Sequence, residues 1–122
     1  MMSAETLEVI RTAAAAAIDK KAFQMVCLEV AELTSYADSF LLCSAASDRQ
    51  VGAVVDEVVR RLRDGGRKPL HVEGDGGGWV LLDYGDLIVH VFTEEKRSYY
   101  ALDSLWGDAP RLSAEALGLA GP

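Results

Sequence analysis

The chain has 122 residues, of which half are hydrophobic and a quarter are charged, and this composition is typical of one globular domain rather than a disordered chain. Its formal net charge of −7 disfavours non-specific binding to a phosphate backbone, so we expect a basic protein partner and no direct nucleic-acid binding as the main contact. No apolar run is long enough to cross a membrane, and the N-terminus resembles neither a secretory signal nor a transit peptide, so we expect a cytoplasmic protein.

The first part of the chain predicts one helix followed by two strands. Ser3 is suited to cap a helix in which apolar residues recur at helical spacing as far as Asp19. Two apolar runs, Met25–Val30 and Phe40–Cys43, predict strands, and the first barely alternates, which indicates burial on both of its faces. Both cysteines of the chain lie in these runs, and we expect them to be buried free thiols.

The middle of the chain predicts a second helix and a short strand, and a third helix follows later. Ser47 and Gln50 have the spacing of a capping box, and the apolar stripe after them predicts a helix that ends at Gly65. Leu70–Glu73 is a short strand, and Glu94–Tyr100 is expected to be a helix with the preceding threonine as its cap.

This order of elements predicts an α/β fold, a single domain in which a mixed β-sheet is covered by helices. We assign the domain to residues 1–110. Residues 111–122 form a C-terminal tail with two alternatives, one helical turn around Ala114–Leu117 or a flexible end.

The run Trp79–Phe92 predicts a β-hairpin with two different faces. Gly85 and Asp86 interrupt it at a point that suits a type II′ turn, which would pair Tyr84 with Leu87. Alternation along the strands then gives one wholly apolar or aromatic face, made of Val80, Leu82, Tyr84, Leu87, Val89 and Val91. The opposite face carries Trp79, Leu81, Asp83, Ile88, His90 and Phe92.

The second face mixes large rings with a carboxylate and an imidazole, so we expect it to bind a partner rather than to form a core. For Trp79 itself, partner contact and half-buried packing both remain open. A slip of one residue in the register would exchange the two faces.

Three features invite an enzymatic interpretation, and each has a simpler alternative. The glycine-rich segment 74–78 resembles a phosphate-binding loop in composition, but a strand follows it and it has no lysine, which favours a linker. Asp83 and Asp86 flank a turn and have no evident third metal ligand. His71 and His90 lie in strands, and no serine or cysteine has a nucleophile-elbow setting, so a structural or interface role is favoured. We therefore expect no enzyme, no cofactor and no metal.

Several segments resemble, in this order, the ribosomal silencing factor family, also called the RsfS or Iojap family. They are Asp19–Ala22, Leu33–Phe40, Ser47–Val51, Glu73–Gly74, Trp79–Phe92 and Tyr100–Pro110. The match extends from about Leu7 to Pro110, and its most specific part is the Trp79–Phe92 block with the later Leu-Trp-Gly-Asp. The resemblance implies an α/β fold similar to nucleotidyltransferases but without their catalytic residues.

The resemblance also implies a function. Such proteins bind the large ribosomal subunit through its ribosomal protein number fourteen, sterically block subunit joining and repress translation under nutrient limitation. The expected contact core consists of Trp79, Leu81, His90 and Phe92, and its expected edge consists of Asp83, Tyr84 and Asp86. Tyr84 enters from the family motif alone, because the hairpin register points it inward. Two alternatives remain, a small nucleotide-binding or nucleotidyltransferase-like enzyme and a homodimer that pairs two hairpin faces.

Overall fold

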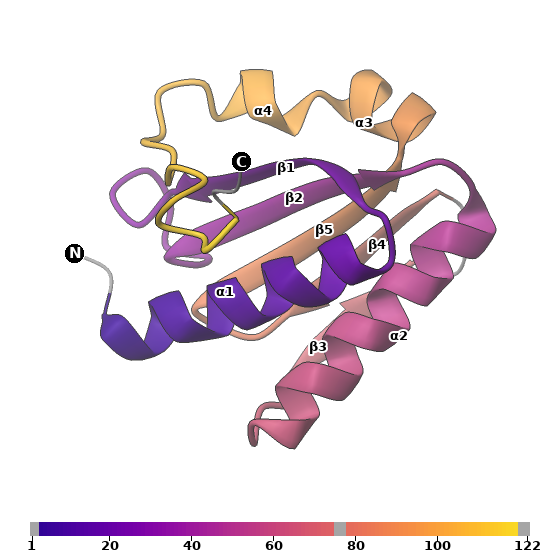
Figure 1. Ribbon diagram of the computed structural model, residues 1–122. Helices are drawn as coiled ribbons and strands as arrows, with labels where there is room; N and C mark the ends of the chain where they lie inside the picture. Colours follow the sequence, from indigo (N-terminus) through magenta and orange to yellow (C-terminus); the bar gives the residue numbers. More distant parts are fainter. Residues whose placement is uncertain (1–2, 75–77, 120–122) are drawn as a thin grey trace.

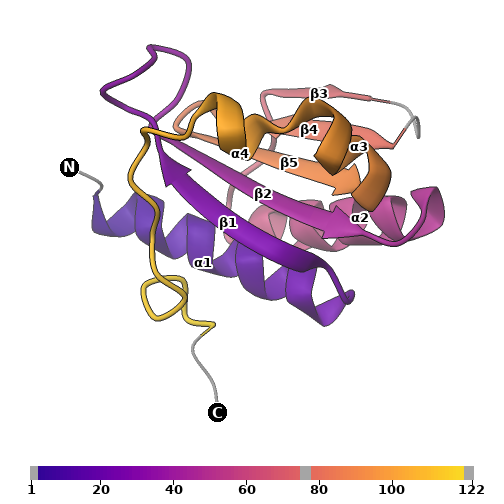
Figure 2. The same ribbon diagram turned by 90° about the horizontal axis from the view of Figure 1, so that it is seen from above.

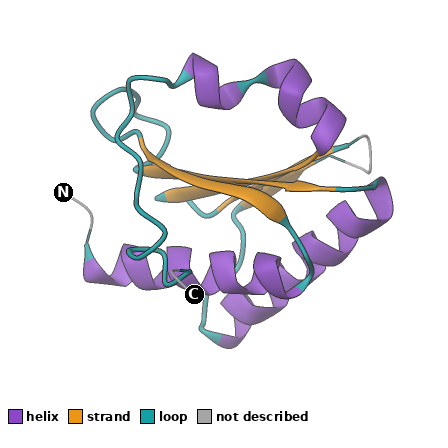
Figure 3. Cartoon of the chain, turned by 45° about the horizontal axis from the view of Figure 1, so that its top comes forward, coloured by secondary structure: helices purple, strands orange, loops and turns teal. Residues whose placement is uncertain are grey.

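The computed structural model describes residues 3–74 and 78–119, and its elements form three layers (Figures 1 and 3). A five-stranded sheet lies in the middle. Helices α1 (Ala4–Asp19) and α2 (Asp48–Asp64) cover one face of the sheet. The shorter helices α3 (Glu94–Tyr100) and α4 (Leu102–Leu105) lie over the other face. The expected α/β fold with a mixed sheet is confirmed.

The strand order in the sheet is β1-β2-β5-β4-β3. The strands are β1 (Phe23–Glu29), β2 (Ser39–Ala45), β3 (His71–Glu73), β4 (Trp79–Asp83) and β5 (Leu87–Thr93). β2 and β5 pair in parallel, and the other neighbours pair antiparallel. β2 is buried along its whole length, because it has a strand on each side and helices over both faces.

Both long helices begin at the residues that the sequence predicts. The Ser3 hydroxyl accepts a hydrogen bond from the Thr6 amide at 3.1 Å, and the Ser47 hydroxyl accepts one from the Gln50 amide at 3.2 Å. The Gln50 side chain does reach back, but its oxygen accepts from the Ala46 amide at 2.6 Å, one residue before the cap. The threonine before α3 caps that helix in the same way.

The main core lies between the sheet and the two long helices. α1 presents Ile10 and four buried alanines, whose small side chains let the helix approach the sheet closely. α2 contributes the stripe Val51, Val54, Val58 and Leu62. Cys27 and Cys43 are buried free thiols, as expected, and burial raises the pKa of each to about 12.

The β4–β5 hairpin has the predicted register, and it reverses direction at Gly85 and Asp86 as expected. The Tyr84 amide donates to the Leu87 carbonyl at 2.8 Å, and Gly85 has φ of +89°, a left-handed conformation that favours glycine. The pairs along the strands are Val80 with Val91 and Leu82 with Val89. The apolar hairpin face packs into the main core, as the alternation predicts.

β1 is an edge strand, and its apolar run is buried on both faces as expected: Cys27 packs into the main core, and Leu28 and Val30 pack into a second apolar cluster on the other face. Its burial comes partly from the C-terminal tail, which runs beside it (Figure 2). The Glu29 amide donates to the Pro110 carbonyl at 2.8 Å, and the Leu112 amide donates to the Cys27 carbonyl at 3.0 Å. The tail thus occupies hydrogen-bonding groups that an edge strand would otherwise leave open.

The tail adopts the turn rather than the flexible alternative over its described residues. The Leu117 amide donates to the Ser113 carbonyl at 3.1 Å, and the Leu117 side chain is buried in the main core. The Arg11 side chain of α1 donates to the Ala116 carbonyl at 2.7 Å. Residues 111–119 are therefore packed against α1 and β1.

Candidate partner-binding site

The second hairpin face carries a row of aromatic rings beneath α3 and α4. The Trp79 ring stacks on Phe92 with centroids 5.1 Å apart, and it contacts Tyr100 of α3 at 4.5 Å. The His90 ring is nearly parallel to Phe92 at 6.0 Å and meets Phe40 edge-on at 5.2 Å. Ring contacts from β2, β5 and α3 therefore surround the row, and each such pair adds to the stability of the packed structure.

One hydrogen bond fixes the chemistry of His90. The Trp79 indole nitrogen Nε1 donates to His90 Nδ1 at 3.2 Å. An indole N–H can only donate, so Nδ1 is the accepting nitrogen and Nε2 carries the proton of the neutral ring. Burial lowers the pKa of His90 to about 4, so the ring is neutral at physiological pH.

Three of the seven expected contact residues are buried in this structure. Phe92 has no exposed surface and His90 is 4% exposed, because both lie in a second apolar cluster under α3 and α4. The interpretation of this whole face as an open surface rather than a core is therefore wrong for its β5 half. Tyr84 is 3% exposed and points into the main core, as the register predicts and contrary to the edge position that the family motif suggests.

The accessible half of this face lies on β4 and β3. Leu81 and Asp83 are partly exposed, and they pair with Glu73 and His71 of the outer strand β3. Both β3 side chains are well exposed, and the His71 ring lies 3.2 Å from the Glu73 carboxylate. Together with the partly exposed Trp79, this half combines apolar and charged groups in the way that partner surfaces do.

Asp86 is a structural anchor as well as a turn residue. Its carboxylate accepts hydrogen bonds from Arg67 at 2.8 Å and from the Thr6 hydroxyl at 3.1 Å. Partial burial opposes ionisation, but the hydrogen bond and charge of Arg67 outweigh it and hold the pKa of Asp86 below its usual range. These two contacts tie the hairpin turn to α1 and to the loop after α2, and sequence reasoning missed them because the partners are distant in the chain.

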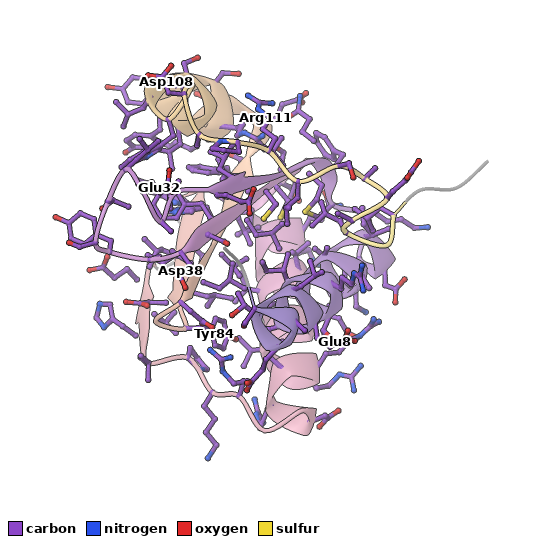
Figure 4. The ribbon with its side chains drawn as sticks, turned by 90° about the vertical axis from the view of Figure 1, so that its left-hand side faces the viewer. Glu8, Glu32, Asp38, Tyr84, Asp108 and Arg111 are labelled. Carbon is purple, nitrogen blue, oxygen red and sulfur yellow. The ribbon has the colours of Figure 1, made fainter. Side chains whose placement is uncertain are left out.

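An acidic cleft of about 440 Å³ adjoins the hairpin turn and was not predicted. Figure 4 looks onto this end of the molecule, where Glu32, Asp38 and Asp108 are labelled. The cleft is lined by Glu29, Ala31, Glu32, Leu33, Asp38, Asp108 and Pro110. The Asp38 amide donates to the Asp86 carbonyl at 2.9 Å, which places the cleft beside the turn. The carboxylates come from three separate segments, so no local motif reveals them.

Within residues 3–74 and 78–119, no group of three His, Cys, Asp or Glu side chains is arranged to hold a metal ion. None of the helices in this part of the chain has the length and apolar character needed to span a bilayer. The centre of the glycine-rich segment, residues 75–77, lies outside the described residues, so the choice between a linker and a phosphate loop stays a prediction there.

Comparison with known proteins gives one consistent result. The family model "Ribosomal silencing factor during starvation" matches residues 3–120. The ribosomal silencing factor RsfS of Bacillus subtilis is 43% identical over 103 residues, which cover 84% of this chain and 87% of that protein. The chloroplastic Iojap protein of Zea mays is 32% identical over 110 residues, which cover 87% of this chain but 46% of that longer protein.

Solved structures agree with the sequence relatives. A crystal structure of a Chromobacterium violaceum protein superposes with a TM-score of 0.80 at 34% identity, covering 87% of this chain and 88% of that one. A crystal structure of a Bacillus halodurans protein superposes with a TM-score of 0.76 at 36% identity, covering 87% of this chain and 97% of that one. The chain therefore belongs to the ribosomal silencing factor family, known also as the RsfS or Iojap family.

Proposed function

We propose that this protein binds the large ribosomal subunit through its ribosomal protein number fourteen, and that it thereby blocks joining of the small subunit and represses translation when nutrients are limiting. The proposal places the protein in the cytoplasm. The observation that carries it is the accessible half of the hairpin face, where Trp79 and Leu81 lie beside exposed charged groups. Family membership supplies the ribosomal context.

Charge supports a basic partner. The chain carries 19 acidic and 12 basic residues, and the acidic cleft adds carboxylates next to the hairpin turn. Opposite charge accelerates the encounter of two proteins, whereas a few desolvated apolar anchors supply most of the affinity. On this surface Trp79 and Leu81 are the proposed anchors. Asp83 and Asp86 lie at the edge, and both carboxylates also hold the turn, since Asp83 accepts from the Gly85 amide at 2.8 Å.

The buried members of the expected site have a supporting role in this proposal. Phe92 stacks under Trp79, and His90 holds the indole nitrogen, so both fix the position of the anchor without touching the partner in this conformation. The proposed mechanism is steric occlusion, in which a bound domain of this size fills space that the small subunit needs. It requires no catalytic step.

Co-sedimentation with separated ribosomal particles tests the proposal. We expect the protein to pellet with large subunits, to leave small subunits unbound, and to reduce the re-formation of whole ribosomes. Leu81→Arg should weaken binding at least about tenfold, because it places a positive charge against a basic partner. Arg60→Ala, on the exposed surface of α2 in the opposite layer, is the matched control and should bind normally. Equal pelleting of both variants would move the contact surface elsewhere, and failure to pellet with any particle would refute the proposal.

The same face could also pair two copies of the chain, which would store the surface when no ribosome is available. Light scattering should then give a mass near twice 13.1 kDa, and Leu81→Arg should return the protein to a monomer. A monomer at every concentration tested would eliminate this arrangement without affecting the ribosomal proposal.

A further inference from the structure

The described part of the chain contains a buried hydrogen-bond donor that has no acceptor. Trp79 fixes the neutral ring of His90 so that Nε2 carries the proton. This Nε2 atom is buried and makes no hydrogen bond within the described residues. A buried donor that makes no hydrogen bond destabilises the folded state. Such a donor in a packed cluster therefore needs an explanation.

Packing alone does not require an imidazole at this position. The neighbours of the His90 ring are the aromatic rings of Phe40, Trp79 and Phe92, among which a phenylalanine would fill similar space without a buried Nε2 donor, although it would remove the Nδ1 acceptor of the partly exposed Trp79 indole. The hydroxyl groups of Ser39 and Tyr84 are also buried without partners. They differ from His90 because Tyr84 belongs to the core closed by the two long helices and Ser39 begins the fully buried strand β2.

The α4 helix that lies over the strand of His90 is a smaller element than the long helices that close the main core. α4 is one turn long, and its N-cap residue Ala101 is a non-glycine residue in the left-handed region, with φ of 49° and no side-chain capping bond. Its Leu105 side chain is 71% exposed, and its apolar contacts with the second cluster come from Leu102 and from Trp106, whose ring meets Phe40 at 5.4 Å. Figure 2 shows α3 and α4 lying across β5, the strand that carries His90.

We propose that α4 is a movable cover over His90, and that a carbonyl oxygen of the ribosomal partner accepts the hydrogen of His90 Nε2 when α4 shifts away. This inference rests on the proposed function and names the chemistry that the site would recognise. A carbonyl fits better than a carboxylate, because the chain is strongly acidic and its partner is therefore basic. The shift would also widen the aromatic surface around Trp79, joining the buried and the accessible halves of the hairpin face.

Two substitutions at one position separate a binding role from a structural one. His90→Phe removes the Nε2 donor and keeps a ring, but it also removes the Nδ1 acceptor of the partly exposed Trp79 indole, so we expect stability in urea unfolding to change little, while affinity for isolated large subunits falls about tenfold. His90→Gln keeps an N–H donor on a side chain of similar reach and should bind better than His90→Phe. Hydrogen exchange adds an independent measurement, since the amides of residues 102–106 should exchange faster in the complex than in the free protein if α4 moves.

The outcomes distinguish this inference from the function on which it rests. If the unaltered protein does not bind large subunits, the proposed function fails and this inference fails with it. If the unaltered protein binds, and His90→Phe binds equally well or α4 is more protected in the complex, only this inference is overturned. If His90→Phe folds but is markedly less stable, the imidazole has a structural role and this inference is overturned. If His90→Gln binds no better than His90→Phe, the proposed hydrogen bond from residue 90 to the partner is also overturned.

Discussion

Asp86 offers a direct test of how the hairpin turn is held in place. Asp86→Asn removes the negative charge beside Arg67 but keeps an amide oxygen that can still accept from the Thr6 hydroxyl. Arg67 also retains its hydrogen bond to the Tyr84 carbonyl at 2.9 Å, so the guanidinium is not left without a partner. The substitution therefore isolates the contribution of one ion pair.

The magnitude follows from the partial exposure of that pair. A hydrogen bond to a charged group contributes about 1.5–3 kcal/mol when buried, whereas an exposed ion pair contributes about 0–1 kcal/mol. Both side chains are close to 30% exposed, at 29% for Arg67 and 30% for Asp86. We therefore expect Asp86→Asn to lower the free energy of unfolding by about 1 kcal/mol, which corresponds to a decrease in Tm of about 4 °C for a domain of this size.

The pH dependence gives the test its direction. Because the pKa of Asp86 is lowered in the folded state, its contribution is complete above the ordinary aspartate pKa of about 3.9 and is lost as pH falls through the folded-state value. Urea unfolding of both proteins from neutral pH to about pH 3 should show a stability difference that is constant at first and then shrinks. Asp64→Asn, at an exposed ion pair of 3.6 Å, is the control and should change stability little. Equal stability of Asp86→Asn and the unaltered protein at neutral pH would refute the reasoning.

Three further substitutions or reactions test other parts of the structure. Ala101→Gly should raise the free energy of unfolding by about 0.5 kcal/mol, because glycine adopts the left-handed conformation of that position without strain. A lower free energy of unfolding for this variant, measured by denaturant titration, would contradict this expectation. Trp79→Ala should cost about 2 kcal/mol of stability, since the ring packs against the rings of His90, Phe92 and Tyr100, whereas Trp79→Phe should cost less than half as much. Cys27 and Cys43 should resist a thiol reagent in the native protein at mildly alkaline pH and react on unfolding, because burial raises both pKa values to about 12; fast reaction of the native protein would show that the core opens.

The sequence predicted the features of this fold that depend on neighbouring residues. The caps at Ser3 and Ser47 are determined within one turn of helix, and the hairpin register follows from the turn at Gly85. These interactions join residues that are close in the chain, so the local pattern contains the information that they need.

Features that depend on distant packing were not predictable in the same way. The apolar run of β1 indicates burial, but the pattern does not tell whether a strand or the returning tail provides it. The second hairpin face was correctly separated from the first, yet its pattern could not show that α3 and α4 fold back over His90 and Phe92. His90 and Phe92 were therefore interpreted as surface residues, whereas the tertiary structure buries both of them under these helices.

The parallel pair at the centre of the sheet has a consequence for how the chain folds. Residues 39–45 pair with residues 87–93, so the β1–β2 and β4–β5 hairpins can each form locally but join only after α2 and β3 have been placed between them. Contacts between segments far apart in the chain require the closure of a long loop, and folding rates fall as such contacts dominate. Docking of the two hairpins is thus the expected slow step, and during synthesis β2 can pair with β1 along one edge but has no strand along its other edge until β5 has been made.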